Sequence, residues 1–189
     1  MVKKVGILGD IGSGKTYIAK CFGYPVFNAD QEVANLYKKD KKILLKLRKV
    51  LPEYFDTPSV NKENITRAIL DKHQNLKTII KIVHLEIKKK LNLFLKKNKS
   101  KKIVILDIPL LLENKINKKS DILVFVKSKK SEVLKRLRKR KYYNYRLIKK
   151  FRNIQLPLDF KKKKCHFVIN NNFNKKTIKK CVKNILQKI

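Results

Sequence analysis

Residues 9–16 read GDIGSGKT, and this stretch decides the fold. It fits the phosphate-binding pattern G-x-x-x-x-G-K-[ST] in full, with Lys15 and Thr16 at its end. A short apolar run over 3–8 precedes it, and a helical pattern over 15–22 follows it. The motif therefore has the strand–loop–helix context that it requires, and it predicts a nucleotide site.

The residue types of this loop suit a polyphosphate. Glycines let successive backbone N–H groups face one anion, and a helix N-terminus adds further free N–H groups. We expect Lys15 to reach the β- and γ-phosphates of ATP and Thr16 to offer its hydroxyl to Mg²⁺. The expected nucleotide-binding residues are Gly9, Ile11, Gly12, Ser13, Gly14, Lys15, Thr16 and Tyr17. The motif does not by itself separate a kinase from another NTPase or a switch.

The rest of the chain alternates strand-like and helix-like segments. Continuous apolar runs predict strands at 25–28, 103–107, 122–126 and 167–169. Helical spacing predicts helices within 30–50, 64–70, 76–95, 131–140 and 145–154, and another at the C-terminus. Continuous apolar strands fit a parallel sheet with helices on both faces. We predict one α/β domain of the P-loop NTPase type over 1–189, with an all-helical insertion at about 31–98.

The formal net charge of +36 suggests a polyanionic partner when it is taken alone. Only seven of the 50 basic residues are arginine, and the lysines are spread along the whole chain. Lysine codons are A/T-rich, so genome composition can also produce this charge. The sequence offers no nucleic-acid-binding motif or aromatic stacking platform. We therefore expect no specific nucleic-acid partner, although the charge favours encounter with anionic substrates.

The sequence also predicts the compartment. No apolar run approaches the roughly 20 residues that span a bilayer, and the N-terminal run is too short for a signal peptide. The three cysteines are odd in number and lack metal-ligand spacing, which favours reduced structural thiols. We expect a cytoplasmic monomer that does not bind membranes.

Two aspartates follow predicted strands, where ligands bind in open α/β sheets. Asp30 follows the strand at 25–28, and its carboxylate can accept or orient the proton of a hydroxyl. It can equally cap the helix that follows. Asp107 ends the strand at 103–107, where it can help to hold Mg²⁺, also through water, or hydrogen-bond the phosphate loop.

Two basic positions and one histidine are further candidates. Arg136 and Arg140 are four residues apart, so we expect them on one helix face. The planar, permanently charged guanidinium suits a phosphoryl group, and a solvated basic face is the alternative. His84 lies on an apolar helix face, where a lone histidine more often has a structural role.

Five segments, taken in order, resemble the dephospho-CoA kinase family. They are GDIGSGKT at 9–16, FNAD at 27–30, DIPLLLEN at 107–114, QLPL at 155–158 and FVINN at 167–171. The last three are more specific than the phosphate loop and separate the chain from adenylate, shikimate and gluconate kinases. The resemblance implies transfer of the γ-phosphate of ATP to the 3′-hydroxyl of the ribose of dephospho-CoA. It also implies a substrate-binding insertion over 31–98 and a mobile lid over about 136–160.

The resemblance also implies roles for single residues. It makes Asp30, Lys15 and Arg140 catalytic, and it places Asn171 near the adenine, where a turn asparagine is the alternative. The implied substrate-binding residues are Asp30, His84, Asp107, Pro109 and Leu110. The chain departs from the family at Asp10, where glycine is usual, and at Asn28, where an acid is usual. It also lacks the proline that usually follows His84 and the glycine that usually follows Asn171. Tyr145 stands where a lid arginine is usual, and Arg146 is adjacent.

Two other functions remain open at this point. One is a different small-molecule or nucleotide kinase on the same core. The other is a basic ATPase stimulated by nucleic acid, whose activity would depend steeply on salt.

Overall fold

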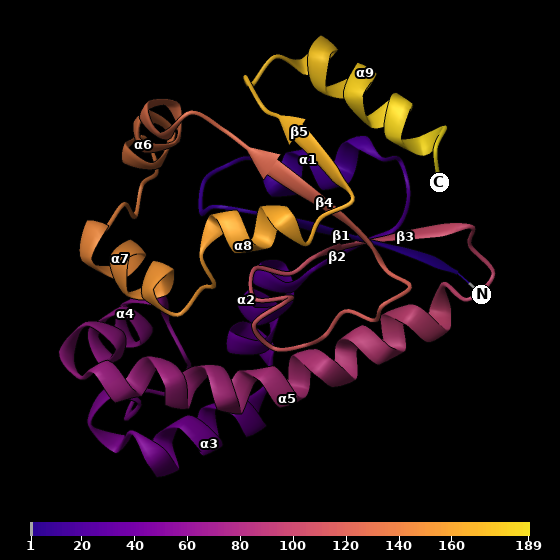
Figure 1. Cartoon of the computed structure of the whole chain (residues 1–189). Coiled ribbons are helices and arrows are strands. Elements are labelled where there is room, and N and C mark those ends of the chain that lie inside the picture. Colours follow the sequence, from indigo (N-terminus) through magenta and orange to yellow (C-terminus); the bar gives the residue numbers. More distant parts are fainter. Residues whose placement is uncertain (1) are drawn as a thin grey trace. The chain divides into compact units, whose positions relative to one another are not determined.

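Five parallel strands form one sheet in the computed structural model, which describes residues 2–189 (Figure 1). They are β1 (Lys3–Gly9), β2 (Val26–Asn28), β3 (Ile103–Asp107), β4 (Ile122–Lys127) and β5 (Phe167–Asn170). The strand order is β2-β3-β1-β4-β5, so the strand that leads into the phosphate loop is central. In the register, Val5 lies opposite Ile105 of β3 and Ile122 of β4. The predicted α/β class is confirmed.

Helices follow every strand except β3, which a loop connects to β4. They are α1 (Lys15–Cys21), α2 (Ala29–Lys39), α3 (Lys41–Val50), α4 (Lys62–Asp71), α5 (His73–Lys97), α6 (Lys130–Arg138), α7 (Tyr145–Asn153), α8 (Leu158–Lys163) and α9 (Lys175–Leu186), with a 3-10 turn at η1 (Pro52–Tyr54). Within residues 2–189, none of these helices combines the length and apolar character that crossing a membrane requires.

The two faces of the sheet are covered differently. Val5, Ile105 and Val124 point to a fully buried face that packs against α1 and α9. Gly6 points to the other face, where a Cβ atom would lie 2.5 Å from a side-chain carbon of Leu111. The loop after β3 therefore packs directly on β1. This close packing fixes the carboxyl ends of β1 and β3, from which the candidate site is built.

The structure differs from the predicted elements at two places. The helical stretch predicted over 30–50 is two helices, because Asp40 interrupts it and caps α3. Its side chain accepts hydrogen bonds from the backbone N–H groups of Lys42 and Ile43, which competes with a continuous helix. The short helix α8 was not predicted, since its sequence LDFKKK has no apolar periodicity.

The described chain divides into two compact units. One contains residues 2–28 and 97–189 and holds the sheet, and the other contains residues 29–96 and is helical. The helical unit has its own apolar core, which includes Ile43, Leu47 and Ile79. One buried amide inside it is that of Asn75, whose Nδ2 donates to the Ala68 carbonyl at 2.9 Å. Its role as a substrate-binding insertion stays a prediction.

Candidate active site

The phosphate loop links the end of β1 to the start of α1, and glycine is required where the backbone turns. Gly9 and Gly14 have φ values of 146° and 92°, which side chains rarely adopt. A Cβ atom at Gly9 would lie 2.6 Å from the Val126 carbonyl oxygen, and one at Gly14 would lie 2.5 Å from Nδ2 of Asn171. The loop therefore curls tightly against β4 and the end of β5.

The polar groups of this loop are held close together. Lys15 Nζ donates to the carbonyl oxygens of Gly9 at 3.0 Å and Asp10 at 2.7 Å. The Ser13 carbonyl accepts hydrogen bonds from Ser128 Oγ at 3.0 Å and from Asn171 Nδ2 at 2.7 Å. The Ser13 hydroxyl is buried and finds no hydrogen-bond partner among residues 2–189. An unpaired buried hydroxyl beside a curled glycine loop fits a site that receives a polar ligand.

Asp107 lies at the carboxyl end of β3 beside this loop, and its side chain is buried. One carboxylate oxygen, Oδ2, accepts hydrogen bonds from Thr16 Oγ1 and from Asn28 Nδ2, both at 2.6 Å. Asn28 ends β2, which pairs with β3 so that Asn28 and Asp107 are opposite in register. The three side chains therefore join the phosphate loop to the ends of two neighbouring strands.

The structure brings some predicted residues together. Lys15, Thr16, Asp107 and Asn171 meet around the phosphate loop. Asn171 supports the loop directly, because its amide binds the Ser13 carbonyl. Among the other predicted residues of this unit, Ile11, Pro109 and Leu110 are half-buried and Tyr17 is exposed.

Asp30 and His84 belong to the helical unit. Asp30 is exposed in the first turn of α2, so it is not the N-cap residue that precedes a helix. His84 is half-buried within α5. Their roles toward a substrate stay predictions.

The expectation that Arg136 and Arg140 share a helix face is wrong. Helix α6 ends at Arg138, and Arg140 lies exposed in the turn beyond it. The Arg136 guanidinium instead lies over the ring of Phe173, 4.4 Å from its centroid. Phe173 has a φ of 62°, and its N–H donates to Oδ1 of Asn171 at 2.8 Å. Nothing in the spacing of the sequence pointed to this pair.

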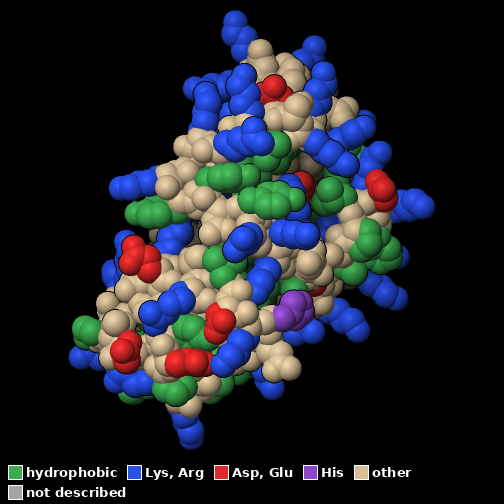
Figure 2. Space-filling view, turned by 90° about the vertical axis from the view of Figure 1, so that its left-hand side faces the viewer, with side chains coloured by type: hydrophobic (Ala, Val, Ile, Leu, Met, Phe, Trp, Pro, Cys, Tyr) green, Lys and Arg blue, Asp and Glu red, His purple; other side chains and the backbone are tan. Residues whose placement is uncertain are grey.

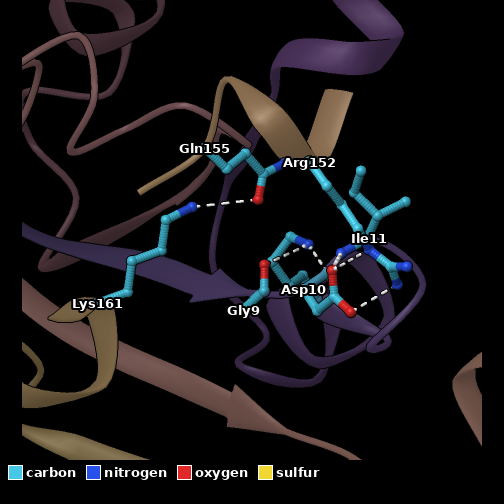
Figure 3. A network of polar contacts seen from close by, with 7 residues as sticks. Gly9, Asp10, Ile11, Arg152, Gln155 and Lys161 are labelled. Carbon is cyan, nitrogen blue, oxygen red and sulfur yellow. Dashed lines mark hydrogen bonds and ion pairs between the residues drawn. The ribbon is translucent and has the colours of Figure 1, made fainter. Parts of the chain in front are cut away.

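Sequence reasoning also missed three polar partners. Asn28, which departs from the family pattern, binds Asp107, a contact that its position at a strand end could have indicated. Asp10, which also departs from the pattern, binds Arg152 (Figure 3). Lys161 is wholly buried and binds Glu113 at 2.6 Å. One lysine in the run KKKK at 161–164 gives no sequence signal of its own.

The basic side chains form no single patch on the face drawn in Figure 2, where blue side chains are scattered over the surface. This distribution agrees with lysines spread along the chain. The cysteines are free thiols. Burial raises the pKa of the Cys165 thiol to about 12, so this thiol stays protonated at neutral pH.

Comparisons with known proteins agree with this geometry. The family model for dephospho-CoA kinase matches residues 3–177. A dephospho-CoA kinase from Wolbachia sp. subsp. Brugia malayi is 30% identical over 190 residues, which cover 98% of this chain and 97% of the relative. A second one, from Streptococcus agalactiae serotype III, is 31% identical and covers both chains in full. A crystal structure from Thermus thermophilus superposes with a TM-score of 0.80 at 24% identity, covering 100% of this chain and 98% of the other.

The last comparison concerns the fold alone, whereas the family match spans the phosphate loop, Asp107 and Asn171. The family match and the relatives, together with the strand–loop–helix cradle, show that this chain belongs to the dephospho-CoA kinase family.

Proposed function

We propose that this chain transfers the γ-phosphate of ATP to the 3′-hydroxyl of the ribose of dephospho-CoA, which yields coenzyme A. The observation that carries the proposal is the cluster of Thr16, Asn28 and Asp107 at the phosphate loop, in a chain of this family. The cluster puts a carboxylate, a hydroxyl and the lysine-bearing loop at one edge of the sheet. Phosphoryl transfer needs little covalent help from a protein, so positioning and charge neutralisation are the main tasks.

The loop would bind the triphosphate of ATP. Backbone N–H groups over 11–17 and the N-terminus of α1 would contact the phosphate oxygens. Lys15 Nζ, which now contacts carbonyl oxygens of Gly9 and Asp10, would move to the β- and γ-phosphates. Asn171 would keep the loop in shape from its place on the Ser13 carbonyl.

The residues present fit Mg²⁺. Thr16 Oγ1 and Asp107 Oδ2 are oxygen donors 2.6 Å apart, and Mg²⁺ in such sites takes one or two protein oxygens together with phosphates and waters. Among residues 2–189 there is no cluster of three or more His, Cys, Asp or Glu side chains of the kind that forms an all-protein metal cage. Bound there, Mg²⁺ would neutralise charge on the β- and γ-phosphates.

Asp30 would act on the acceptor. A ribose hydroxyl is a weak nucleophile, and a carboxylate can orient it and accept its proton. His84, Pro109 and Leu110 would contribute to binding of dephospho-CoA. Arg140 would neutralise charge on the transferring phosphoryl group, and a lid over about 136–160 would close to exclude water. We place the reaction in the cytoplasm, performed by a monomer without nucleic acid or membrane.

The test is an ADP-release assay with Mg·ATP, in the presence and absence of dephospho-CoA, with the mass of the product measured. ADP release that depends on dephospho-CoA, together with the gain of one phosphate on that molecule, supports the proposal. Binding of ATP without acceptor-dependent turnover would contradict it. A panel of sugars, shikimate, nucleosides and RNA in the same assay would then identify another kinase or a nucleic-acid-stimulated ATPase.

A further inference from the structure

Arg152 is bound to the phosphate loop by a two-point contact. Its Nε donates to Asp10 Oδ1 at 3.1 Å, and its Nη2 donates to Asp10 Oδ2 at 2.7 Å (Figure 3). Arg152 lies in the last turn of α7, and Asp10 is the second residue of the loop. Two parallel charge-assisted hydrogen bonds fix the plane of a guanidinium as well as its position.

Asp10 is itself held firmly in the loop. Its Oδ1 also accepts the backbone N–H of Ile11 at 2.7 Å, and its carbonyl oxygen accepts Lys15 Nζ at 2.7 Å. The carboxylate therefore has little freedom to rotate. Arg152 and Lys15 contact the same residue, so two cations meet at the turn that is shaped for phosphate.

The chain that follows Arg152 is anchored from the other side. Oε1 of Glu113, in the loop after β3, accepts the backbone N–H of Leu156 at 2.9 Å and Lys161 Nζ at 2.6 Å. Lys161 is wholly buried and also donates to Oε1 of Gln155 at 3.2 Å (Figure 3). This anchor fixes the segment 155–161 and thereby limits where Arg152 can lie.

The guanidinium keeps donors for a second acceptor. An arginine has five N–H donors, and Asp10 binds only the edge formed by Nε and Nη2. The pair borders a hollow of about 370 Å³, lined by Asp10, Lys130, Arg152 and residues 155–158. Lys130 and Arg152 outweigh the single Asp10 carboxylate there, so the hollow favours an anion.

The geometry points to Arg152 as a further catalytic residue that contacts the transferring phosphoryl group, with Asp10 as the residue that positions it. The ion pair is exposed (41% for Arg152 and 20% for Asp10), so its main effect is on orientation rather than on stability. The inference rests on the proposed kinase function of this loop. It adds to the proposed role of Arg140, which lies exposed beyond α6.

The negative charge of Asp10 also opposes phosphate binding, and this makes the inference testable. Its carboxylate lies in the loop that must bind the phosphates, and only a paired cation cancels its repulsion. Loss of Arg152 should therefore harm ATP binding more when Asp10 is present than when it is absent. A merely structural contact would not produce this dependence.

The experiment compares Arg152→Gln, Asp10→Asn, the double variant and the wild type in turnover and in ATP binding by calorimetry. We expect Arg152→Gln to lower kcat about 100-fold, as expected for an arginine that stabilises charge in the transition state. Asp10→Asn should lower kcat about tenfold through misorientation of the arginine. The double variant should match Arg152→Gln in kcat, and it should bind ATP several-fold more tightly than Arg152→Gln does.

Two further variants make the outcome specific. Lys135→Gln removes an exposed cation of α6 outside the proposed lid and should leave kcat and ATP affinity unchanged. Arg152→Lys should recover ATP affinity but not kcat, because an ammonium cannot form the two-point contact. Melting curves confirm that each variant is folded.

Wild-type kcat in Arg152→Gln would overturn the inference, and so would independent, multiplicative effects of the two substitutions. If the wild type lacked turnover with dephospho-CoA, the proposed function would fail, while the ATP-binding comparison would still decide the relation between Asp10 and Arg152. Equal ATP affinity in Arg152→Gln and the double variant would overturn the inference in that case.

Discussion

Charged side chains are used differently in the two units. In the sheet unit, Lys161 and Glu113 are 0% and 10% exposed, 2.6 Å apart, and each has a further polar partner. In the helical unit, Lys72 and Glu53 lie 3.0 Å apart but are 61% and 53% exposed. Exposed pairs contribute little to stability, whereas a buried pair fixes the segments that carry it. In a chain with 50 basic residues, burial and partners identify the few with a specific role.

The same contrast holds for the way each unit joins its elements. The sheet unit uses charges to hold the loops at the carboxyl ends of its strands, as Asp10 and Glu113 do. The helical unit joins its elements mainly through apolar packing and buried amides, such as Asn64, whose Nδ2 donates to the Tyr54 carbonyl at 2.6 Å. Arg48 is an exception, since it donates to the carbonyl oxygens of Phe55 at 2.9 Å and Thr57 at 2.8 Å. We therefore expect charge removal to have large effects in the first unit and, apart from Arg48 and the candidate base Asp30, small ones in the second.

The largest effect is expected at Lys15. Lys15→Ala removes the cation that would neutralise charge on the phosphates in the transition state, so kcat should fall about a thousandfold or more. ADP release with saturating ATP and dephospho-CoA measures this. Lys20→Ala is the matched control, because Lys20 is an exposed lysine of the same helix α1. Turnover near that of the wild type in Lys15→Ala would mean that the loop does not bind the reacting phosphates.

Asp30 is the exception expected within the helical unit. Asp30→Asn keeps the size of the side chain but removes its basicity, so kcat should fall about 100-fold or more with ATP affinity almost unchanged. Steady-state kinetics and calorimetry separate the two quantities. Glu63→Gln removes another acid from the first turn of a helix in this unit and serves as the control. Equal losses in both variants would assign Asp30 to helix stability.

Lys161 tests the buried pair of the sheet unit. Lys161→Met keeps most of the chain length but leaves the Glu113 carboxylate buried without its cation, which should cost about 3–5 kcal/mol of unfolding free energy. Denaturant titration measures the loss. Lys162→Met changes an exposed neighbour and should have almost no effect. Adding Glu113→Gln should recover much of the loss, because the amide oxygen can still accept the Leu156 N–H.

Glu86 should show the smallest effect. Hydrogen bonds from Lys89 and Lys46 lower the pKa of its carboxyl below the ordinary value of 4.5. A lowered folded-state pKa stabilises the fold at pH values above the ordinary pKa. This stabilisation is lost as the pH falls through the folded-state pKa. Glu86→Gln should therefore cost about 0.5 kcal/mol or less at pH 7, and this cost should shrink as the pH falls below 4.5. A loss that stays constant as the pH falls would point to packing rather than charge.

Much of the sheet could be predicted because its strands are short, continuous apolar runs between clear breaks. The phosphate loop and Asp107 could be predicted because backbone curvature and strand ends restrict residue type. The pair of Asp10 and Arg152 could not, since 142 positions separate its members and each looks like an ordinary surface charge. The break at Asp40 was missed because one capping carboxylate outweighed a helical pattern that is apolar on both sides of it.

The burial of Lys161 has a consequence for chemical footprinting. Its neighbours at 162–164 are exposed and should react promptly with amine-specific reagents, while its own amine is covered. Covered groups react only during local opening, so the rate of modification follows the opening equilibrium. The rate at which this one amine is modified, followed by mass spectrometry, would therefore report local opening of the segment after Arg152.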